Sequence, residues 1–260
     1  MSQALTYANY LKLDEILTAQ ELRSGEHDEM LFIIIHQVYE LWFKQMLHEL
    51  DYLRQMFDQN ETSRALHTLR RTLTILKTVV AQIDVLETMT PQEFLSFRDR
   101  LDSASGFQSY QFRELEFLLG HKRRNVLIHY PEGTTARTQL EKRYAEPSLW
   151  DAFLHYLAAN RHKIPAELLD RDVTEPVQPS PAVQKALIKI YRKHPILVRV
   201  CERLVDLDEG MQEWRYRHVK MVERTIGTKK GTGGSAGVHY LQSTMLRPLF
   251  PDLWAIRTEL

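Results

Sequence analysis

The sequence predicts an all-α protein, built as a bundle of long helices with irregular connections. Three observations predict this class. Apolar residues recur every three or four positions over long stretches, helix start and stop signals bracket several of these stretches, and strand-like segments are scarce. The chain also contains no internal repeat, so a stack of repeated units is not expected.

The first long helix is predicted from Asp28 to Phe57. Its apolar stripe is formed by Phe32, Ile35, Tyr39, Trp42, Met46, Leu50 and Leu53. A second stretch, Ala65 to Leu86, repeats this spacing and predicts another long helix. Two amphipathic helices of this length should pack against each other through their apolar faces.

Shorter helices are predicted from their boundary signals. Thr90 begins the text TPQE, which supplies an N-cap, a proline at the first helical position and a glutamate at the third, so a helix should run from there to about Leu101. A helix is expected from Tyr110 to Leu119, ended by Gly120. Ser148 is a suitable N-cap for a further helix through residue 159.

The second half of the chain contains one more long helix. Four of the ten prolines lie between Pro165 and Pro181, which indicates a connection. Pro195 then begins a helical stretch that extends to residue 226 and should stop at Gly227. Only the segment 125–130 has a composition that suits an extended strand.

Five of the ten glycines lie between residues 227 and 237, in GTKKGTGGSAG. This segment is predicted to be a mobile loop, acting either as a linker or as a lid that brings Thr232 or Ser235 to a ligand. A phosphate loop is disfavoured because the Gly-Lys-Ser/Thr ending is missing. A hydrolase elbow needs a preceding strand, and a di-iron bundle needs Glu-x-x-His pairs; the sequence offers neither.

Composition favours a small neutral ligand or another protein as partner. The chain has 260 residues, with 34 Lys plus Arg against 34 Asp plus Glu, so no excess charge points to nucleic acid or to an anionic membrane. A single cysteine, Cys201, excludes an internal disulfide framework. With no signal peptide and no spanning segment visible, we expect one cytoplasmic domain over residues 1–260.

His218 lies on the apolar stripe of the predicted 195–226 helix, with Leu207, Met211, Trp214 and Met221. Its ring should therefore point toward the core. A core histidine hydrogen-bonded to a carbonyl would explain this position. An axial haem ligand would also explain it, because haem iron is held by such an imidazole in an apolar pocket. The pattern alone leaves both interpretations open.

His36 has the same ambiguity on the inward face of the first long helix, between Phe32 and Tyr39. It is either a structural histidine or a pocket residue that makes one directed hydrogen bond to a ligand.

Arg98 shares a helix face with Phe94 and Leu101. A guanidinium in apolar surroundings needs an anion or a route to water. It therefore either pairs with an aspartate such as Asp102, extends to solvent, or binds a substrate carboxylate through its planar fork.

Three parts of the chain resemble the tryptophan 2,3-dioxygenase family. The first combines LTYANYLKLDEIL at 5–17 with HDEMLFIIIHQVYELWFKQMLHELD at 27–51. The second is ETMTPQEFLSFRDRLDSASGFQSYQFRELEFLLG at 87–120, and the third is WRYRHVKMVERTIGTKKGTGGSAGVHYL at 214–241. Residues 121–195 give the weakest match and are not tied to a motif of the family.

The resemblance implies a helical enzyme with haem b, ferrous in its active form, that uses O2 to cleave the indole C2–C3 bond of L-tryptophan and gives N-formyl-L-kynurenine. His218 matches the proximal ligand of the haem iron; the nearby His239 does not. Ser105 and Gly106 match pocket residues that contact haem and substrate.

The resemblance also implies how the substrate is bound. His36 matches the distal histidine that faces the indole N–H, and Phe32 matches a pocket wall. Arg98 matches the clamp on the substrate carboxylate, beside Phe94, where some members have tyrosine. Thr232 matches the loop threonine that contacts the substrate ammonium group.

Family members are homotetramers, and Tyr7 and Tyr10 match N-terminal residues that enter a neighbouring subunit's site. The segment 1–20 is therefore expected to reach another copy of the chain. Two alternatives to the dioxygenase remain at this stage: a haem sensor on the same scaffold, and a cofactor-free helical interaction protein.

Overall fold

The computed structural model describes residues 4–229, 242, 245 and 247–260. No strand occurs among these residues, which confirms the all-α class. The α-helices are α1 (Tyr7–Leu11), α2 (Leu13–Ile16), α3 (Asp28–Asp58), α4 (Thr62–Leu86), α5 (Pro91–Arg98), α6 (Tyr110–Leu118), α7 (Thr135–Ala145), α8 (Leu149–Ala159), α9 (Ala166–Leu169), α10 (Pro181–Lys193), α11 (Pro195–Ile226) and α13 (Pro251–Ala255). Short 3₁₀ helices are η1 (Gly106–Gln108), η2 (Arg124–His129) and η3 (Ile256–Glu259).

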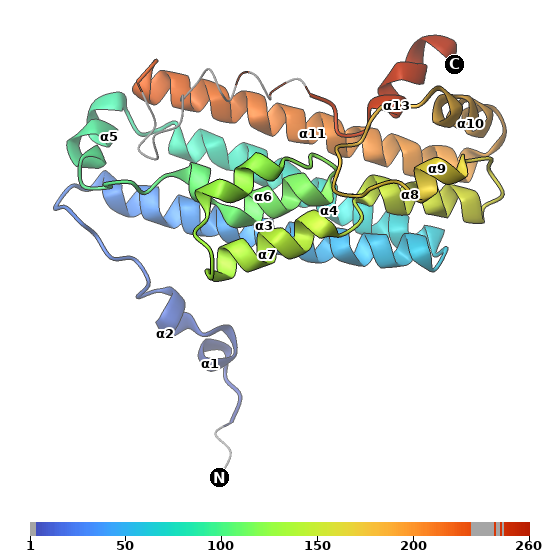
Figure 1. Ribbon diagram of the computed structural model, residues 1–260. Helices are drawn as coiled ribbons and strands as arrows, with labels where there is room; N and C mark the ends of the chain where they lie inside the picture. The colour runs from blue at the N-terminus through green and yellow to red at the C-terminus, as the bar shows by residue number, and fades with distance from the viewer. Residues whose placement is uncertain (1–3, 230–241, 243–244, 246) are drawn as a thin grey trace.

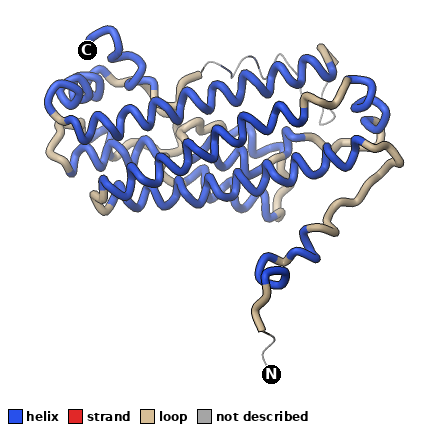
Figure 2. The backbone as a smooth tube through the Cα atoms, turned by 180° about the vertical axis from the view of Figure 1, so that it is seen from behind, coloured by secondary structure: helices blue, strands red, loops and turns tan. Residues whose placement is uncertain are grey.

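Three long helices form the body of the molecule (Figures 1 and 2). The helix α4 packs along both α3 and α11, while α6 and α8 pack on α3. Buried side chains of these helices, of α10 and of the C-terminal segment belong to one hydrophobic cluster. The prediction of a single domain over residues 1–260 stays a prediction.

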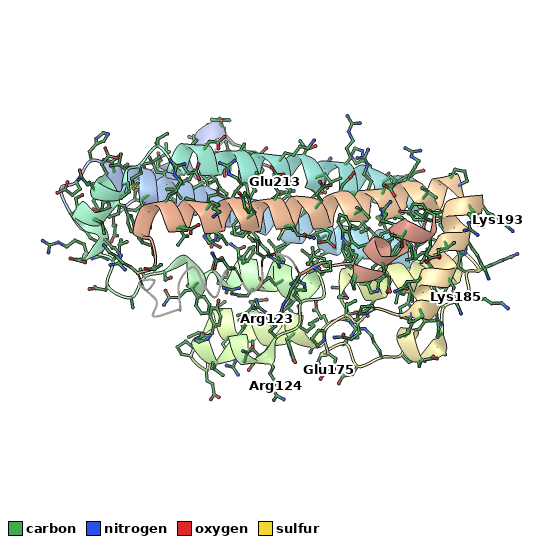
Figure 3. The ribbon with its side chains drawn as sticks, turned by 90° about the horizontal axis from the view of Figure 1, so that it is seen from above. Arg123, Arg124, Glu175, Lys185, Lys193 and Glu213 are labelled. Carbon is green, nitrogen blue, oxygen red and sulfur yellow. The ribbon has the colours of Figure 1, made fainter. Side chains whose placement is uncertain are left out.

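Amphipathic patterning explains the bundle. The buried residues of α3 and α4 recur at helical spacing, as the sequence indicated. Charged side chains cover the outside, for example Lys185 and Lys193 on α10 and Glu213 on the outer face of α11 (Figure 3). The burial of the apolar stripes therefore orients each helix about its own axis, and this rotation decides which side chains can face an internal cavity.

Gly210 lets α11 approach α4 closely. A Cβ atom at this position would lie 2.7 Å from Cδ2 of Leu76 on α4, closer than real Cβ contacts. A glycine in a helix interior costs stability relative to alanine, so its place here is explained by the close contact between the two helices.

The predicted caps are present. Thr90 and Glu93 form a capping box at the start of α5, and Ser148 caps α8 through the N–H of Asp151. The helix α5 ends at Arg98, three residues before the end expected at Leu101.

The extended segment expected at 125–130 is wrong, because residues 124–129 form the 3₁₀ helix η2. Of the apolar side chains in this segment, Val126, Leu127 and Tyr130 are buried in a second hydrophobic cluster against Phe117 and Leu140, whereas Ile128 is exposed. Alternating faces of a strand would have buried only part of this set. The short helix α9 lies inside the proline-rich connection, and α7 and α10 were not predicted.

An N-terminal arm, residues 4–26, leaves the bundle (Figure 1). None of the residues of α1 and α2 is buried. The arm is fixed where it joins α3, because the buried Glu29 carboxylate accepts the main-chain N–H groups of Arg23 and Ser24 at 2.7 and 2.8 Å. Among the described residues, no helix has the length and apolar character needed to cross a membrane.

A candidate active site in a cavity between α3 and α11

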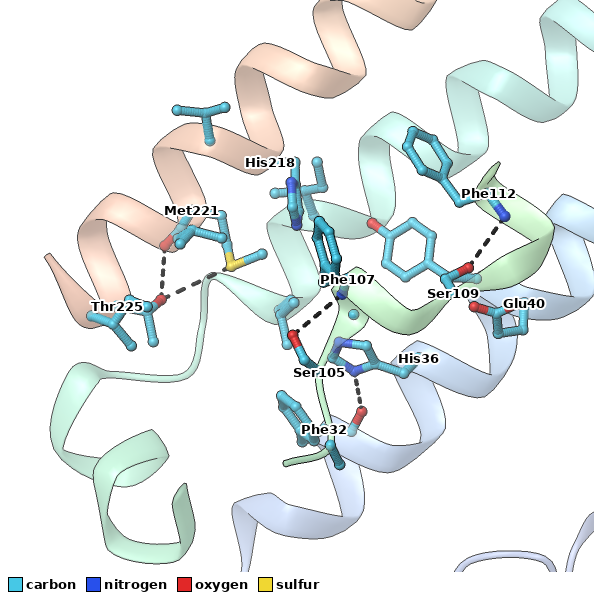
Figure 4. A pocket seen from close by; sticks show the side chains of 18 of the residues that line it. Phe32, His36, Glu40, Ser105, Phe107, Ser109, Phe112, His218, Met221 and Thr225 are labelled. Atoms are coloured by element: carbon cyan, nitrogen blue, oxygen red, sulfur yellow. Dashed lines mark hydrogen bonds between the residues drawn. The ribbon is translucent and has the colours of Figure 1, made fainter. Parts of the chain in front are cut away.

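A cavity of about 260 Å³ lies at the end of the bundle that carries α5 (Figures 1 and 4). Its walls come from the first half of α3, the end of α4, α5, the segment 101–109, α6 and the last turns of α11. Most of the lining side chains are apolar, and a few polar groups converge on the cavity. This combination is typical of a small-molecule site.

His218 of α11 lines the cavity. Protein surrounds its imidazole except where the ring faces the cavity. Burial, with smaller contributions from the nearby His36 and Arg113, lowers the pKa of His218 to about 4. The imidazole is therefore neutral near pH 7 and has a nitrogen lone pair to offer. Its ring lies parallel to Trp214, at 5.1 Å between centroids and 3° between planes. This stacking restricts the ring's orientation.

His36 of α3 lines the same cavity (Figure 4). Its Nδ1 lies 2.6 Å from the main-chain carbonyl of Phe32, one turn earlier. A carbonyl can only accept, so Nδ1 carries the hydrogen and Nε2 of the neutral ring is an acceptor. Burial lowers the pKa of His36, against the raising effects of the Phe32 carbonyl and the Glu40 charge. The site thus contains a second neutral imidazole, and this one can accept a hydrogen bond.

Phe32 and Phe94 line the cavity next to His36, and Phe97 packs against both of them. Phe32 lies 4.2 Å from the His36 ring, and Phe94 and Phe97 of α5 lie 5.7 and 5.6 Å from Phe32, all measured between centroids. Arg98, the last residue of α5, lines the cavity next to this wall. The arginine that was conspicuous in the sequence therefore carries its guanidinium to a largely apolar cavity, where a planar donor fork can bind a carboxylate.

Ser105 and Gly106 line the cavity where η1 begins. The Ser105 hydroxyl accepts the Phe107 N–H at 3.3 Å and so caps the short helix. A Cβ atom at Gly106 would meet no heavy atom within 4 Å, and this glycine is absent from the residues with positive φ. The backbone does not demand glycine here, so its effect is to leave space on this wall of the cavity.

A charged cluster lies on one side of the cavity. The buried Glu116 carboxylate lies 2.7 Å from Arg113, 2.6 Å from Arg123 and 3.6 Å from Arg215. Burial raises the pKa of Glu116, but the attraction of the three guanidinium groups outweighs it and brings the pKa to about 2. Arg113, Glu116 and Arg215 line the cavity. Arg113 and Arg215 thus bring guanidinium groups, which can bind anions, to this side of the cavity.

The structure brings together seven of the residues singled out from the sequence. Phe32, His36, Phe94, Arg98, Ser105, Gly106 and His218 all line this cavity, and their individual roles stay predictions. Tyr7 and Tyr10 are not part of it: they are 76% and 70% exposed on the N-terminal arm. Thr232, Ser235 and His239 lie outside the described residues.

Sequence reasoning missed several lining residues. Arg113, Glu116 and Arg215 were not singled out, although the alternation of charged and apolar residues in RELEFLL, starting at Arg113, was a visible signal. Charged residues inside an apolar helix must be paired or face a cavity. Glu40, one turn after His36, was missed for the same reason.

Fold and cavity together define an all-α protein with a largely apolar internal cavity, which is lined by two neutral imidazoles and by arginine side chains that can bind anions. A family model described as tryptophan 2,3-dioxygenase matches residues 1–146 and 147–260. A relative from Herpetosiphon aurantiacus named tryptophan 2,3-dioxygenase is 63% identical over 262 residues, covering 100% of both chains. Relatives of the same name from Anaeromyxobacter sp. (strain K) and Pseudomonas fluorescens are 56% and 42% identical; each covers 100% of this chain, and they match over 97% and 92% of their own lengths.

The chain therefore belongs to the tryptophan 2,3-dioxygenase family. It is an enzyme, an oxidoreductase of the dioxygenase class. The resemblance drawn from the three sequence segments is confirmed.

Proposed function

We propose that this chain adds both atoms of O2 across the indole C2–C3 bond of L-tryptophan, in a haem-dependent reaction that gives N-formyl-L-kynurenine. The observation that carries the proposal is the pair of neutral imidazoles, on α3 and α11, that line one cavity in a chain of this family. Haem b, ferrous in the active form, would supply the activation of dioxygen when bound in this cavity.

The residues present fit such a group. His218 would hold the haem iron through a neutral nitrogen, and its ring is oriented by Trp214. Gly106 leaves open space that a flat ring can use. Arg113 and Arg215 line the cavity, where their guanidinium groups would bind carboxylates of the ligand.

His36 would orient the substrate. Because its Nδ1–H is used by the Phe32 carbonyl, the free acceptor is Nε2, which complements the N–H of an indole. In this role His36 holds the ring in place and is not an essential base. Phe32 and Phe94 would contact the indole faces and edges, and Ser105 would bound the pocket from the opposite segment.

Arg98 would bind the substrate carboxylate through two parallel hydrogen bonds. Thr232, outside the described residues, and a carboxylate of the haem would both bind the substrate ammonium group. Two fixed points on the amino acid, together with the indole site, would select the L enantiomer. Their binding energy serves to position the indole for reaction and to exclude water.

The purified protein tests this function by its absorption spectrum. We expect an intense Soret band, a change of the ferrous spectrum under air when L-tryptophan is added, and formation of N-formyl-L-kynurenine. A haem sensor would show the band without turnover, and a cofactor-free interaction protein would stay colourless after addition of hemin. Either result would contradict the proposal. D-tryptophan and tryptamine should react poorly, because tryptamine lacks the carboxylate and D-tryptophan cannot place its carboxylate and its ammonium group at both points while the indole occupies its site.

The N-terminal arm supports a homotetramer in which Tyr7 and Tyr10 complete a neighbouring copy's site. Apolar side chains that a lone chain leaves exposed concentrate on this arm: Leu5, Tyr7, Tyr10, Leu11, Ile16, Leu17 and Leu22. Light scattering of the full chain should give four copies, and a Tyr7→Ala/Tyr10→Ala variant should bind tryptophan more weakly. A monomer with full affinity would contradict this assembly. We also propose that the protein is cytoplasmic and that neither nucleic acid nor a membrane is among its partners.

A further inference from the structure

Glu40 places a carboxylate in the cavity wall, one helical turn after His36 (Figure 4). Gln111, near the start of α6, contacts it twice. The Nε2 amide of Gln111 donates to Oε2 of Glu40 at 2.8 Å and to the main-chain carbonyl of Glu40 at 2.9 Å. A side-chain amide has two hydrogens, so both donors of Gln111 are committed to this one residue.

The two bonds join different walls of the cavity. Glu40 belongs to the wall that carries Phe32 and His36, whereas Gln111 lies two residues after the segment 105–109, which forms another wall. Ser109 couples that segment to the helix, since its hydroxyl caps α6 by accepting the Phe112 N–H at 3.3 Å. A shift of Gln111 along α3 would therefore displace the 105–109 wall as well.

Apolar packing alone would hold these walls less specifically. The Phe43 and Phe112 rings meet with centroids 5.4 Å apart, a contact that tolerates sliding. One of the Gln111 bonds ends on the α3 backbone, and the other ends on a charged acceptor, which makes it the stronger kind of hydrogen bond. Together they specify one register of α6 on α3.

We propose that Gln111 and Glu40 form a positioning pair that sets the spacing between His36 and the 105–109 wall, and with it the alignment of the indole. The proposal rests on the proposed function for the identity of the ligand. Neither residue needs to touch the substrate's reacting atoms; both act through the walls they connect.

The test compares Gln111→Met with Gln45→Met. Methionine keeps the length of the side chain and removes the donors in both cases. Gln45 is a matched control, because its Nε2 also donates to a glutamate, Glu49, at 2.8 Å, but both residues belong to α3 and neither lines the cavity. Two quantities are measured: the Kd of L-tryptophan for the ferrous haem protein without oxygen, from the Soret shift, and hydrogen exchange of the 105–116 amides.

We expect Gln111→Met to weaken tryptophan binding about tenfold, the size of one charge-assisted hydrogen bond, and to speed exchange in 105–116. Gln45→Met should change neither quantity. Unchanged exchange and unchanged Kd in Gln111→Met would overturn the proposal, as would equal effects of the two variants. If the wild type itself does not bind tryptophan, the proposed function fails, and the exchange measurement still decides the positioning role.

Glu40 provides a second route if Gln111→Met folds poorly. In Glu40→Gln an amide oxygen can still accept from Gln111, whereas Glu40→Ala leaves only the main-chain acceptor. A positioning role predicts that Glu40→Gln loses less affinity and less exchange protection than Glu40→Ala. Equal losses in the two variants would overturn the proposal, because they would assign the effect to the charge of Glu40 alone.

Discussion

Acidification should destabilise this protein through His121, which lies between two elements that border the cavity. Arg215 Nη2 donates to His121 Nδ1 at 3.0 Å, and His121 Nε2 donates to the Pro248 carbonyl at 3.4 Å. A guanidinium only donates, so this arrangement requires a neutral imidazole. Burial, followed by repulsion from Arg215, lowers the pKa of His121 from 6.5 to about 4.

The sign of the effect follows from proton uptake. Below pH 6.5 the unfolded chain binds a proton at this histidine that the folded chain does not bind until about pH 4. The contribution of the neutral His121 to the free energy of unfolding is therefore fully present above pH 6.5 and is lost as the pH drops through this window. A depression of the pKa from 6.5 to about 4 corresponds to a loss of at most about 2 kcal/mol at about pH 5.

Urea unfolding of the wild type and of His121→Asn at about pH 8 and about pH 5 measures this contribution. Asparagine keeps an acceptor for Arg215 but does not titrate in this range. The wild type should lose about 2 kcal/mol more than the variant on acidification, since all other groups titrate alike in both. Equal losses of the free energy of unfolding in the two proteins would refute the conclusion that the fold requires a neutral His121. A larger loss in the variant would show that protonation of His121 stabilises the fold.

Three further predictions concern the cavity and the helix contact beneath it. His218→Ala should lose most of its affinity for hemin, measured by Soret titration, with partial restoration by added imidazole; an unchanged ligand-field spectrum would contradict its axial role. Arg98→Lys should raise the KM for L-tryptophan at least about tenfold, because lysine cannot form the bidentate contact; a normal KM would contradict the clamp. Gly210→Ala should destabilise the fold by about 1 to 3 kcal/mol through the clash with Leu76, less the gain in helix propensity. Combining it with Leu76→Ala in denaturant unfolding should cost less than the sum of the two changes, and simple additivity would contradict the contact.

Long helices could be predicted because many turns repeat the same signal. The helix α3 begins at Asp28, as predicted, and α11 extends from Pro195 to Ile226, between the proline and the glycine that marked its ends. In α7 only Leu140 is buried, so no apolar stripe exists to be detected. The helix α10 does carry a stripe, but it follows the prolines that indicated a connection.

The inward direction of His36 and His218 could be predicted from helical spacing, whereas their meeting could not. Periodicity orients each side chain about its own helix axis and says nothing about which helices become neighbours. That His36 and His218 line one cavity depends on how α3 and α11 pack on α4, including the close approach at Gly210. Only the family resemblance supplied this pairing in advance.

Buried charge is the signal that carries most information about ligands in this chain. Glu116 and its three arginines satisfy one another well enough to hold the pKa of the carboxyl near 2, which explains how they can be buried at all. Arg113, Glu116 and Arg215 all line the cavity, so a ligand bound there would meet this paired cluster directly. An anionic group of the ligand would add a further partner for the two guanidinium groups, and its binding should then stabilise the fold as well as serve the reaction.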